Sequence, residues 1–258
     1  MDIIIFGGQS NMQGQSGQVP EINEPVAGAW EYRSVGNQTI PLQIPVGEDI
    51  GGNKYYLGAS HASGSLIPAF CRAYVKATDR EVIAISACRG DTTLVDWHKG
   101  TYRYFHAARK IRAGIEKAKS MGHMEHISYV WLQGESDAII GTTEEQYVEN
   151  LIRYKEMLKA DFGIEKFGII KVGYFFCTSQ WHTTWGTYEA KKAKDEAIMR
   201  AQEKAVETDS DFTMLTRICT ELSMKPEYIN PNASGHYNNE ALDLIGQAAG
   251  DAMAKVLS

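Results

Sequence analysis

Five short apolar runs recur along the chain, and a segment with helical periodicity separates each run from the next. The runs lie at residues 2–6, 81–87, 127–132, 168–176 and 211–216. They are mostly continuous rather than alternating in polarity, which is typical of parallel strands that helices cover on both faces. The pattern predicts an α/β fold: a three-layer α/β/α sandwich with right-handed crossovers and a mainly parallel five-stranded sheet.

Helical stripes occupy the intervals between these runs. Apolar residues spaced by three and four predict helices around residues 104–118 and 147–158. A stripe of alanines predicts a helix over 190–205, and another is expected over 240–256. The segment 66–78 has a weaker helical pattern and is also expected to be a helix.

Residues 14–60 interrupt this alternation, because they are rich in Gly, Pro and polar residues and show little periodicity. A loop of that length is uncommon unless it is functional. We therefore expect loops here, with room for short strands, over one edge of the sheet. No repeat, low-complexity tract or linker divides the 258 residues, so a single domain spanning 1–258 is expected.

Charge and cysteine usage exclude several classes of protein. The formal net charge is −6 and no basic run occurs, which argues against nucleic acid or an anionic membrane as partner. No apolar stretch approaches the roughly 18–20 residues that span a bilayer. The first residues lack the features of a secretory signal, and the four cysteines form no CxxC pair. These features favour a cytoplasmic protein with reduced thiols; they leave its oligomeric state open.

Small and polar side chains follow the predicted strands at the points where the strands end. In open α/β sheets, the carboxyl ends of parallel strands meet at one edge, and ligands bind there. We expect that edge to gather Ser10, Gly90, Gln133, Glu135, Trp181 and His236.

A serine and a histidine at one such edge permit acyl transfer. A serine hydroxyl becomes a competent nucleophile when a neighbouring base takes its proton, and histidine is the usual base at neutral pH. The backbone N–H groups of Ser10 and Gly90 and the side-chain NH₂ of Gln133 are candidate donors to the oxyanion.

Four sequence blocks carry a family resemblance: "GGQSNMQG" (7–14), "ACRGDTTLVDW" (87–97), "WLQGESDA" (131–138) and "GHYNNEALDLIG" (235–246). In this order they resemble the SGNH hydrolase superfamily, and within it the sialate O-acetylesterase/acetylxylan esterase-like group, similar to carbohydrate esterase family 6. The "MRAQ" at 199–202 is similar to a further signature of that group. The resemblance implies a flavodoxin-like fold and metal-free, cofactor-free hydrolysis of acetyl esters on carbohydrates. It also implies that Ser10 is the nucleophile, that His236 is the base, and that Gln133 replaces the superfamily's asparagine.

One position departs from the superfamily pattern. An aspartate often stands three residues before the histidine, and Ala233 occupies that position here. Glu135 is the preferred substitute as third member of the triad. Asp137, the amide of Asn232 and a backbone carbonyl are the alternatives, as is a Ser–His dyad that works without an acid.

Several other residues admit both a functional and a structural interpretation. Trp181 and Trp185 are candidates for stacking on a sugar ring, or for packing their loop against the core. His123 and His126 lack a clear third ligand, so no metal site is expected. Cys88 has no activating partner in the sequence and is interpreted as a buried thiol.

These residues predict a serine esterase that removes acetyl or other short acyl groups from a small carbohydrate through an acyl-enzyme. The sugar itself is not indicated; residues 14–60 and 177–188 are expected to select it. The alternative, suggested by Ala233, is a carbohydrate-binding protein that kept the fold without the chemistry. A nucleotide-binding role ranks third, because the glycine-rich start has neither the P-loop ending nor the GxGxxG order.

Overall fold

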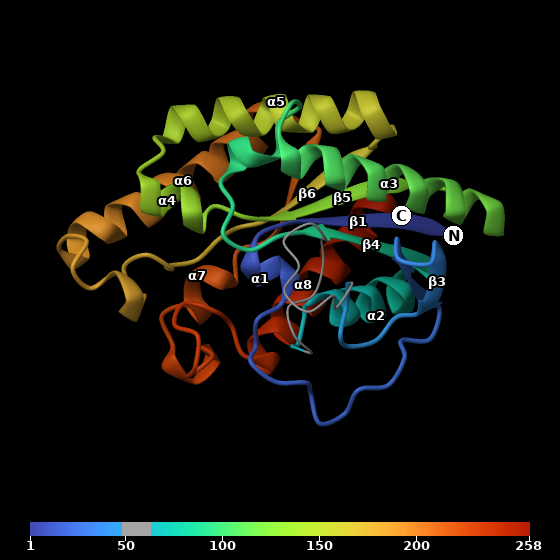
Figure 1. The fold of residues 1–258 in the computed structure, drawn as a ribbon, viewed down its shortest axis with the longest axis horizontal. Coiled ribbons are helices and arrows are strands. Elements are labelled where there is room, and N and C mark those ends of the chain that lie inside the picture. Colours follow the sequence, from blue (N-terminus) through green and yellow to red (C-terminus); the bar gives the residue numbers. More distant parts are fainter. Residues whose placement is uncertain (48–62) are drawn as a thin grey trace.

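One sheet runs through the middle of the protein (Figure 1). The structure, a computed structural model, describes residues 1–47 and 63–258. Within those ranges the sheet has seven strands in the order β3-β2-β4-β1-β5-β6-β7. The strands are β1 (Asp2–Gly8), β2 (Ala29–Arg33), β3 (Gln38–Pro41), β4 (Val82–Cys88), β5 (Ile127–Leu132), β6 (Lys166–Ile170) and β7 (Phe212–Thr216).

All neighbouring strands are parallel except β2 and β3, which form an antiparallel hairpin at one edge. The five strands expected from the sequence are β1, β4, β5, β6 and β7. Their order in the sheet is second, first, third, fourth, fifth, which is the flavodoxin-like order. The mainly parallel α/β fold is therefore confirmed, and the hairpin widens the sheet beyond five strands. The hairpin comes from the segment 14–60, of which residues 48–60 lie outside the described part.

The fourth expected strand is shorter than predicted. β6 ends at Ile170, and the apolar residues after it leave the sheet. Beyond Lys171, side chains bind this backbone: Val172 N–H donates to Gln202 Oε1 at 3.0 Å, and Phe176 N–H donates to Asp195 Oδ1 at 3.0 Å. The run is apolar because it is buried, and its polarity pattern alone does not distinguish a strand from a buried loop.

Helices cover both faces of the sheet, as Figure 1 shows. One layer holds α3 (Tyr102–Met121), α5 (Glu144–Phe162) and α6 (Tyr188–Thr208); the other holds α2 (Ile67–Thr78) and α8 (Asn239–Leu257). The five expected helices and the three layers are thus confirmed. α2 and α8 pack closely because Gly246 and Gly250 face the α2 backbone, where a Cβ atom would come within 2.3 Å of a carbonyl oxygen. No helix in the described ranges is long and apolar enough to cross a membrane.

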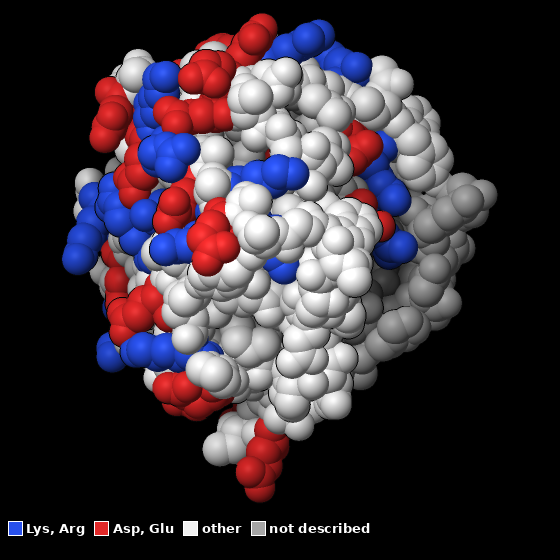
Figure 2. Space-filling view, turned by 90° about the vertical axis from the view of Figure 1, so that its left-hand side faces the viewer, with Lys and Arg blue, Asp and Glu red and all other residues white. Residues whose placement is uncertain are grey.

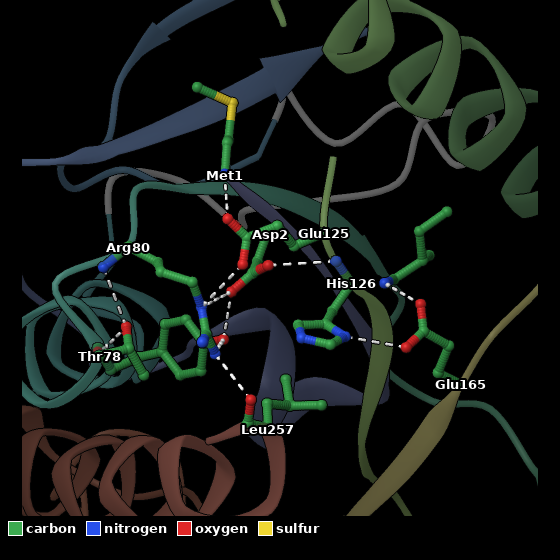
Figure 3. Close-up of polar contacts among 10 residues, drawn as sticks. Met1, Asp2, Thr78, Arg80, Glu125, His126, Glu165 and Leu257 are labelled. Atoms are coloured by element: carbon green, nitrogen blue, oxygen red, sulfur yellow. Dashed lines mark hydrogen bonds and ion pairs between the residues drawn. The ribbon is translucent and has the colours of Figure 1, made fainter. Parts of the chain in front are cut away.

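A buried ion pair joins three elements at the amino ends of the strands (Figure 3). The Arg80 Nε donates to Asp2 Oδ2 at 2.7 Å, and the Asp2 side chain is fully buried. The same guanidinium donates to the Tyr74 hydroxyl at 3.0 Å and to the Leu257 carbonyl at 3.1 Å. Arg80 therefore ties the start of β1 to α2 and to the end of α8.

Ligand atoms of Asp2, Glu125 and His126 lie within 4.8 Å of one another beside this pair. The protein's own groups already neutralise them, because Arg80 pairs with both carboxylates and His126 Nδ1 lies 2.9 Å from Glu165. We therefore interpret this cluster as an ion-pair network that holds the amino end of β1 in place (Figure 3).

Replacing Arg80 by methionine should lower the free energy of unfolding by about 3–5 kcal/mol, because it leaves the buried Asp2 carboxylate without its cation. The matched control is Arg200→Met, which breaks an ion pair with Glu144 that is more than half exposed on the arginine side. An exposed pair of this kind contributes about 0–1 kcal/mol. Urea unfolding of both variants measures the difference, and equal losses would contradict the role assigned to Arg80.

Candidate active site

A cavity of about 430 Å³ opens at the carboxyl ends of the central strands. Its wall includes Ser10, Gly90, Trp181 and His236, so the structure brings together four of the residues singled out in the sequence. Figure 2 faces the end of the protein at which the parallel strands finish. Charged side chains gather toward one side of this face, and its middle carries few of them.

Ser10 begins the short helix α1 (Ser10–Gln13), which follows β1 almost directly. The turn requires glycine at position 8, where φ is +135° and a Cβ atom would lie 2.0 Å from the Leu132 carbonyl oxygen. β1 can therefore end close against β5, and the serine is held at the switch point of the sheet. Gly90 lies beside it, since a Cβ atom at Gly90 would be 3.3 Å from Ser10 Cβ.

His236 is buried in the loop before α8 and packs edge-on against Phe175, with ring centroids 5.4 Å apart. Its Nδ1 lies 3.2 Å from the Ala233 carbonyl oxygen. A carbonyl can only accept, so Nδ1 carries the proton and Nε2 keeps its lone pair. Burial lowers the pKa of His236 from 6.5, and the carbonyls of Ala233 and Ser234 partly oppose this effect. The imidazole is thus neutral at pH 7 and able to accept a proton. No hydrogen bond joins it to the Ser10 hydroxyl within the described ranges.

The sequence predicts Glu135 as the third member of a triad, and in the structure its carboxyl group bonds to Asn11 rather than to His236. Glu135 Oε1 accepts from Asn11 Nδ2 at 2.8 Å. Asp137 is engaged elsewhere as well, because its Oδ2 accepts from the Leu94 N–H at 2.8 Å. The group on His236 Nδ1 is a backbone carbonyl, one of the alternatives left open by the sequence.

Gln133, which the sequence predicts as a donor in the oxyanion hole, lies outside the cavity wall. It is completely buried, and its NH₂ donates to the Thr92 carbonyl at 2.9 Å and to Asp137 Oδ2 at 2.6 Å. Its own backbone carbonyl accepts from Gln202 Nε2 at 2.9 Å, which explains the glutamine of the "MRAQ" block. Gln133 thus binds the loops after β4 and β5 to α6.

Gln9 is a cavity residue that the sequence analysis missed. Its Oε1 accepts from Gln133 Nε2 and from the Ser136 N–H, both at 3.2 Å. With the oxygen held by these donors, the NH₂ of the same amide is left for the cavity that Gln9 lines. The only signal in the sequence was its position next to Ser10, which carries no chemical information by itself.

Gln13 is a second cavity residue that the sequence analysis missed. Its Oε1 accepts from the Gly90 N–H at 2.8 Å. This backbone donor therefore becomes available to another acceptor only when the Gln13 side chain moves.

The two tryptophans differ in their placement. Trp181 lines the cavity, lies 5.7 Å from the His236 ring and is 56% exposed. Trp185 does not line it; this ring packs edge-on against His182 at 4.9 Å. The expectation for Cys88 is confirmed: the thiol is free and buried, and burial raises its pKa to about 11.

A family profile described as "Carbohydrate esterase, sialic acid-specific acetylesterase" matches residues 1–254. The chain belongs to this family. This bears out the family resemblance seen in the four sequence blocks. No curated protein sequence matches the chain significantly.

Three solved structures share the fold of this family member. A protein from Arabidopsis thaliana superimposes with a TM-score of 0.71 and 18% identity, covering 99% of this chain and 97% of that one. NanS gives 0.65 and 13%, with coverage of 99% and 96%. A lipase/acylhydrolase from Enterococcus faecalis gives 0.53 and 13%, with coverage of 99% and 97%. At these identities the likeness concerns the fold.

Replacing Gln133 by methionine should lower the free energy of unfolding by about 2–4 kcal/mol, because it strips buried acceptors of their donor. The folded fraction should keep its kcat within about tenfold, since the side chain does not reach the cavity and the Ser136 N–H still donates to the Gln9 amide oxygen. Denaturant unfolding and ester hydrolysis per folded molecule test this together. Unchanged stability with a kcat loss of about 100-fold or more would restore Gln133 to the oxyanion hole.

Proposed function

We propose that this protein is a serine esterase that hydrolyses O-acetyl esters on a small carbohydrate. The observation that carries the proposal is the presence of Ser10 and a neutral, buried His236 on the wall of one cavity. Membership of a carbohydrate acetylesterase family supports the reaction class. No step of this reaction calls for a cofactor.

In the proposed reaction, the Ser10 hydroxyl attacks the ester carbonyl carbon and His236 Nε2 takes its proton. The tetrahedral intermediate collapses when the sugar oxygen leaves with that proton, and acetyl remains on Ser10. Water then attacks the acyl-enzyme, again giving its proton to His236, and acetate departs as Ser10 is restored. The Ala233 carbonyl keeps the imidazole in the required tautomer throughout.

We assign the oxyanion to three donors: the Ser10 N–H, the Gln9 NH₂ and the Gly90 N–H. Gln9 takes the place first given to Gln133, because its amide is oriented by donors to its oxygen. Gly90 joins them when the ester displaces the Gln13 side chain from its N–H. Each such donor typically contributes about 100–1,000-fold to the rate.

Trp181 is our candidate for contact with the sugar ring, since it is exposed on the cavity wall. Trp185 is a candidate only for contact with the outer part of a larger substrate, because it lies outside the cavity wall. A cavity of about 430 Å³ suits a monosaccharide or a short oligosaccharide. The family description makes acetylated sialic acids the first substrates to examine.

Replacing Ser10 by alanine should abolish acetate release from acetylated monosaccharides and from 4-nitrophenyl acetate, a loss of at least about 1,000-fold in kcat. Ser128→Ala is the matched control, because this buried β5 hydroxyl has no partner within the described ranges. Equal hydrolysis by the Ser10 variant would refute the proposal. Saccharide binding without any acetate release would instead favour the non-catalytic alternative that Ala233 suggested.

The pH profile should report the state of His236. The base must be neutral, so activity should rise with pH through the histidine pKa and then level off. Because burial lowers that pKa below 6.5, kcat/KM should already be near its plateau at pH 7 and fall only in more acidic solution. An acidic limb with an apparent pKa above 7 would contradict the environment described for this imidazole.

A further inference from the structure

We propose that Asn11 is a positioning residue that sets the distance between Ser10 and His236, and that Glu135 acts by holding Asn11. The inference rests on the proposed esterase function and deepens it. It gives a role to two buried side chains that the proposed reaction leaves unused, Asn11 at 2% and Glu135 at 3% exposure.

The Asn11 side chain bridges the two halves of the site. It follows the nucleophile in α1, and its Oδ1 accepts from the Tyr237 N–H at 3.3 Å. Tyr237 is the residue directly after His236. One side chain therefore connects the neighbour of the nucleophile to the neighbour of the base, across 226 residues of sequence.

Chemistry fixes the orientation of this amide. A backbone N–H can only donate, so the oxygen of Asn11 must face Tyr237, and its NH₂ must face the other way. On that side lies Glu135 Oε1, which accepts at 2.8 Å. By accepting from the Asn11 NH₂, Glu135 prevents a flip of the Asn11 amide that would place its NH₂ against the Tyr237 N–H.

Glu135 needs only an acceptor oxygen for this role, and its negative charge is not required. Its second oxygen, Oε2, is buried without a partner within the described ranges. A carboxylate that stabilised the imidazolium of His236 would have to contact the ring, whereas Nδ1 faces the Ala233 carbonyl. Glutamine offers the same acceptor at the same length and should replace Glu135 with little loss.

The test compares substitutions at both positions, using 4-nitrophenyl acetate hydrolysis for kcat and KM and thermal unfolding for the folded fraction. Glu135→Gln should keep kcat within about threefold. Asn11→Asp should lower kcat by about 10–100-fold with KM nearly unchanged, because two carboxyl groups then face each other. Combining Asn11→Asp with Glu135→Gln should restore most of the rate, since the glutamine NH₂ donates to the introduced carboxyl.

Glu31→Met separates positioning from stability. Glu31 is a fully buried glutamate of β2 that accepts from the Gly47 N–H, at the edge of the sheet away from the cavity. Its loss should lower the unfolding temperature while each folded molecule keeps its kcat. Glu135→Gln and the double variant keep a hydrogen bond between positions 11 and 135, so we expect both to fold. Their kcat values therefore still test the proposal if Asn11→Asp or Glu31→Met fails to fold.

A kcat loss of 1,000-fold or more in Glu135→Gln would overturn the proposal and make Glu135 an acid of the reaction. An unimpaired Asn11→Asp variant would overturn it too, as would a double variant no faster than Asn11→Asp. Ser10→Ala in the same assay distinguishes a failure of the proposed esterase function from a failure of the positioning role alone. If the wild-type protein shows no Ser10-dependent hydrolysis, the proposed function fails and the positioning role fails with it; if only the Asn11 and Glu135 results disagree, the esterase stands.

Discussion

Buried polar side chains at the ends of the strands determine how this edge of the sheet is built. Water is excluded there, so each amide and carboxyl must find a partner from another loop. Gln133 meets the Thr92 carbonyl and Asp137, and Gln202 reaches the backbone of Gln133 from α6. These hydrogen bonds connect the loops after β4 and β5 to each other and to α6.

The same requirement explains how a histidine can be held without a carboxylate. Ala233 removes the acid that the superfamily often provides, yet the loop folds so that the Ala233 carbonyl itself meets Nδ1 of His236. A carbonyl fixes the tautomer as a carboxylate does, but it carries only a partial charge to stabilise the imidazolium. In the proposed reaction, the correct placement of the His236 ring must therefore compensate for the missing carboxylate charge. Side chains that set this placement, such as Asn11, then matter more for the rate.

The sequence predicted the scaffold well because continuous apolar runs and helical stripes reflect burial directly. It failed at β6, where Val172 and Phe176 are buried but bind Gln202 and Asp195 instead of a strand. At the site, Ser10, Gly90 and His236 were located because motif order follows strand order. The hydrogen-bond partners of Gln133 and Glu135 could not be predicted, because the direction of a side-chain amide or carboxyl depends on distant segments that no local pattern encodes.

The central claim is that the Ser10 hydroxyl is the nucleophile and is activated by His236. Labelling with a fluorophosphonate, which reacts covalently with activated serine hydroxyls, tests it most directly when peptide mass spectrometry locates the adduct. The account predicts one adduct per chain, located on Ser10, with labelling greatly slowed in His236→Ala. Labelling of another residue by an active preparation, or equally fast labelling without the histidine, would contradict it.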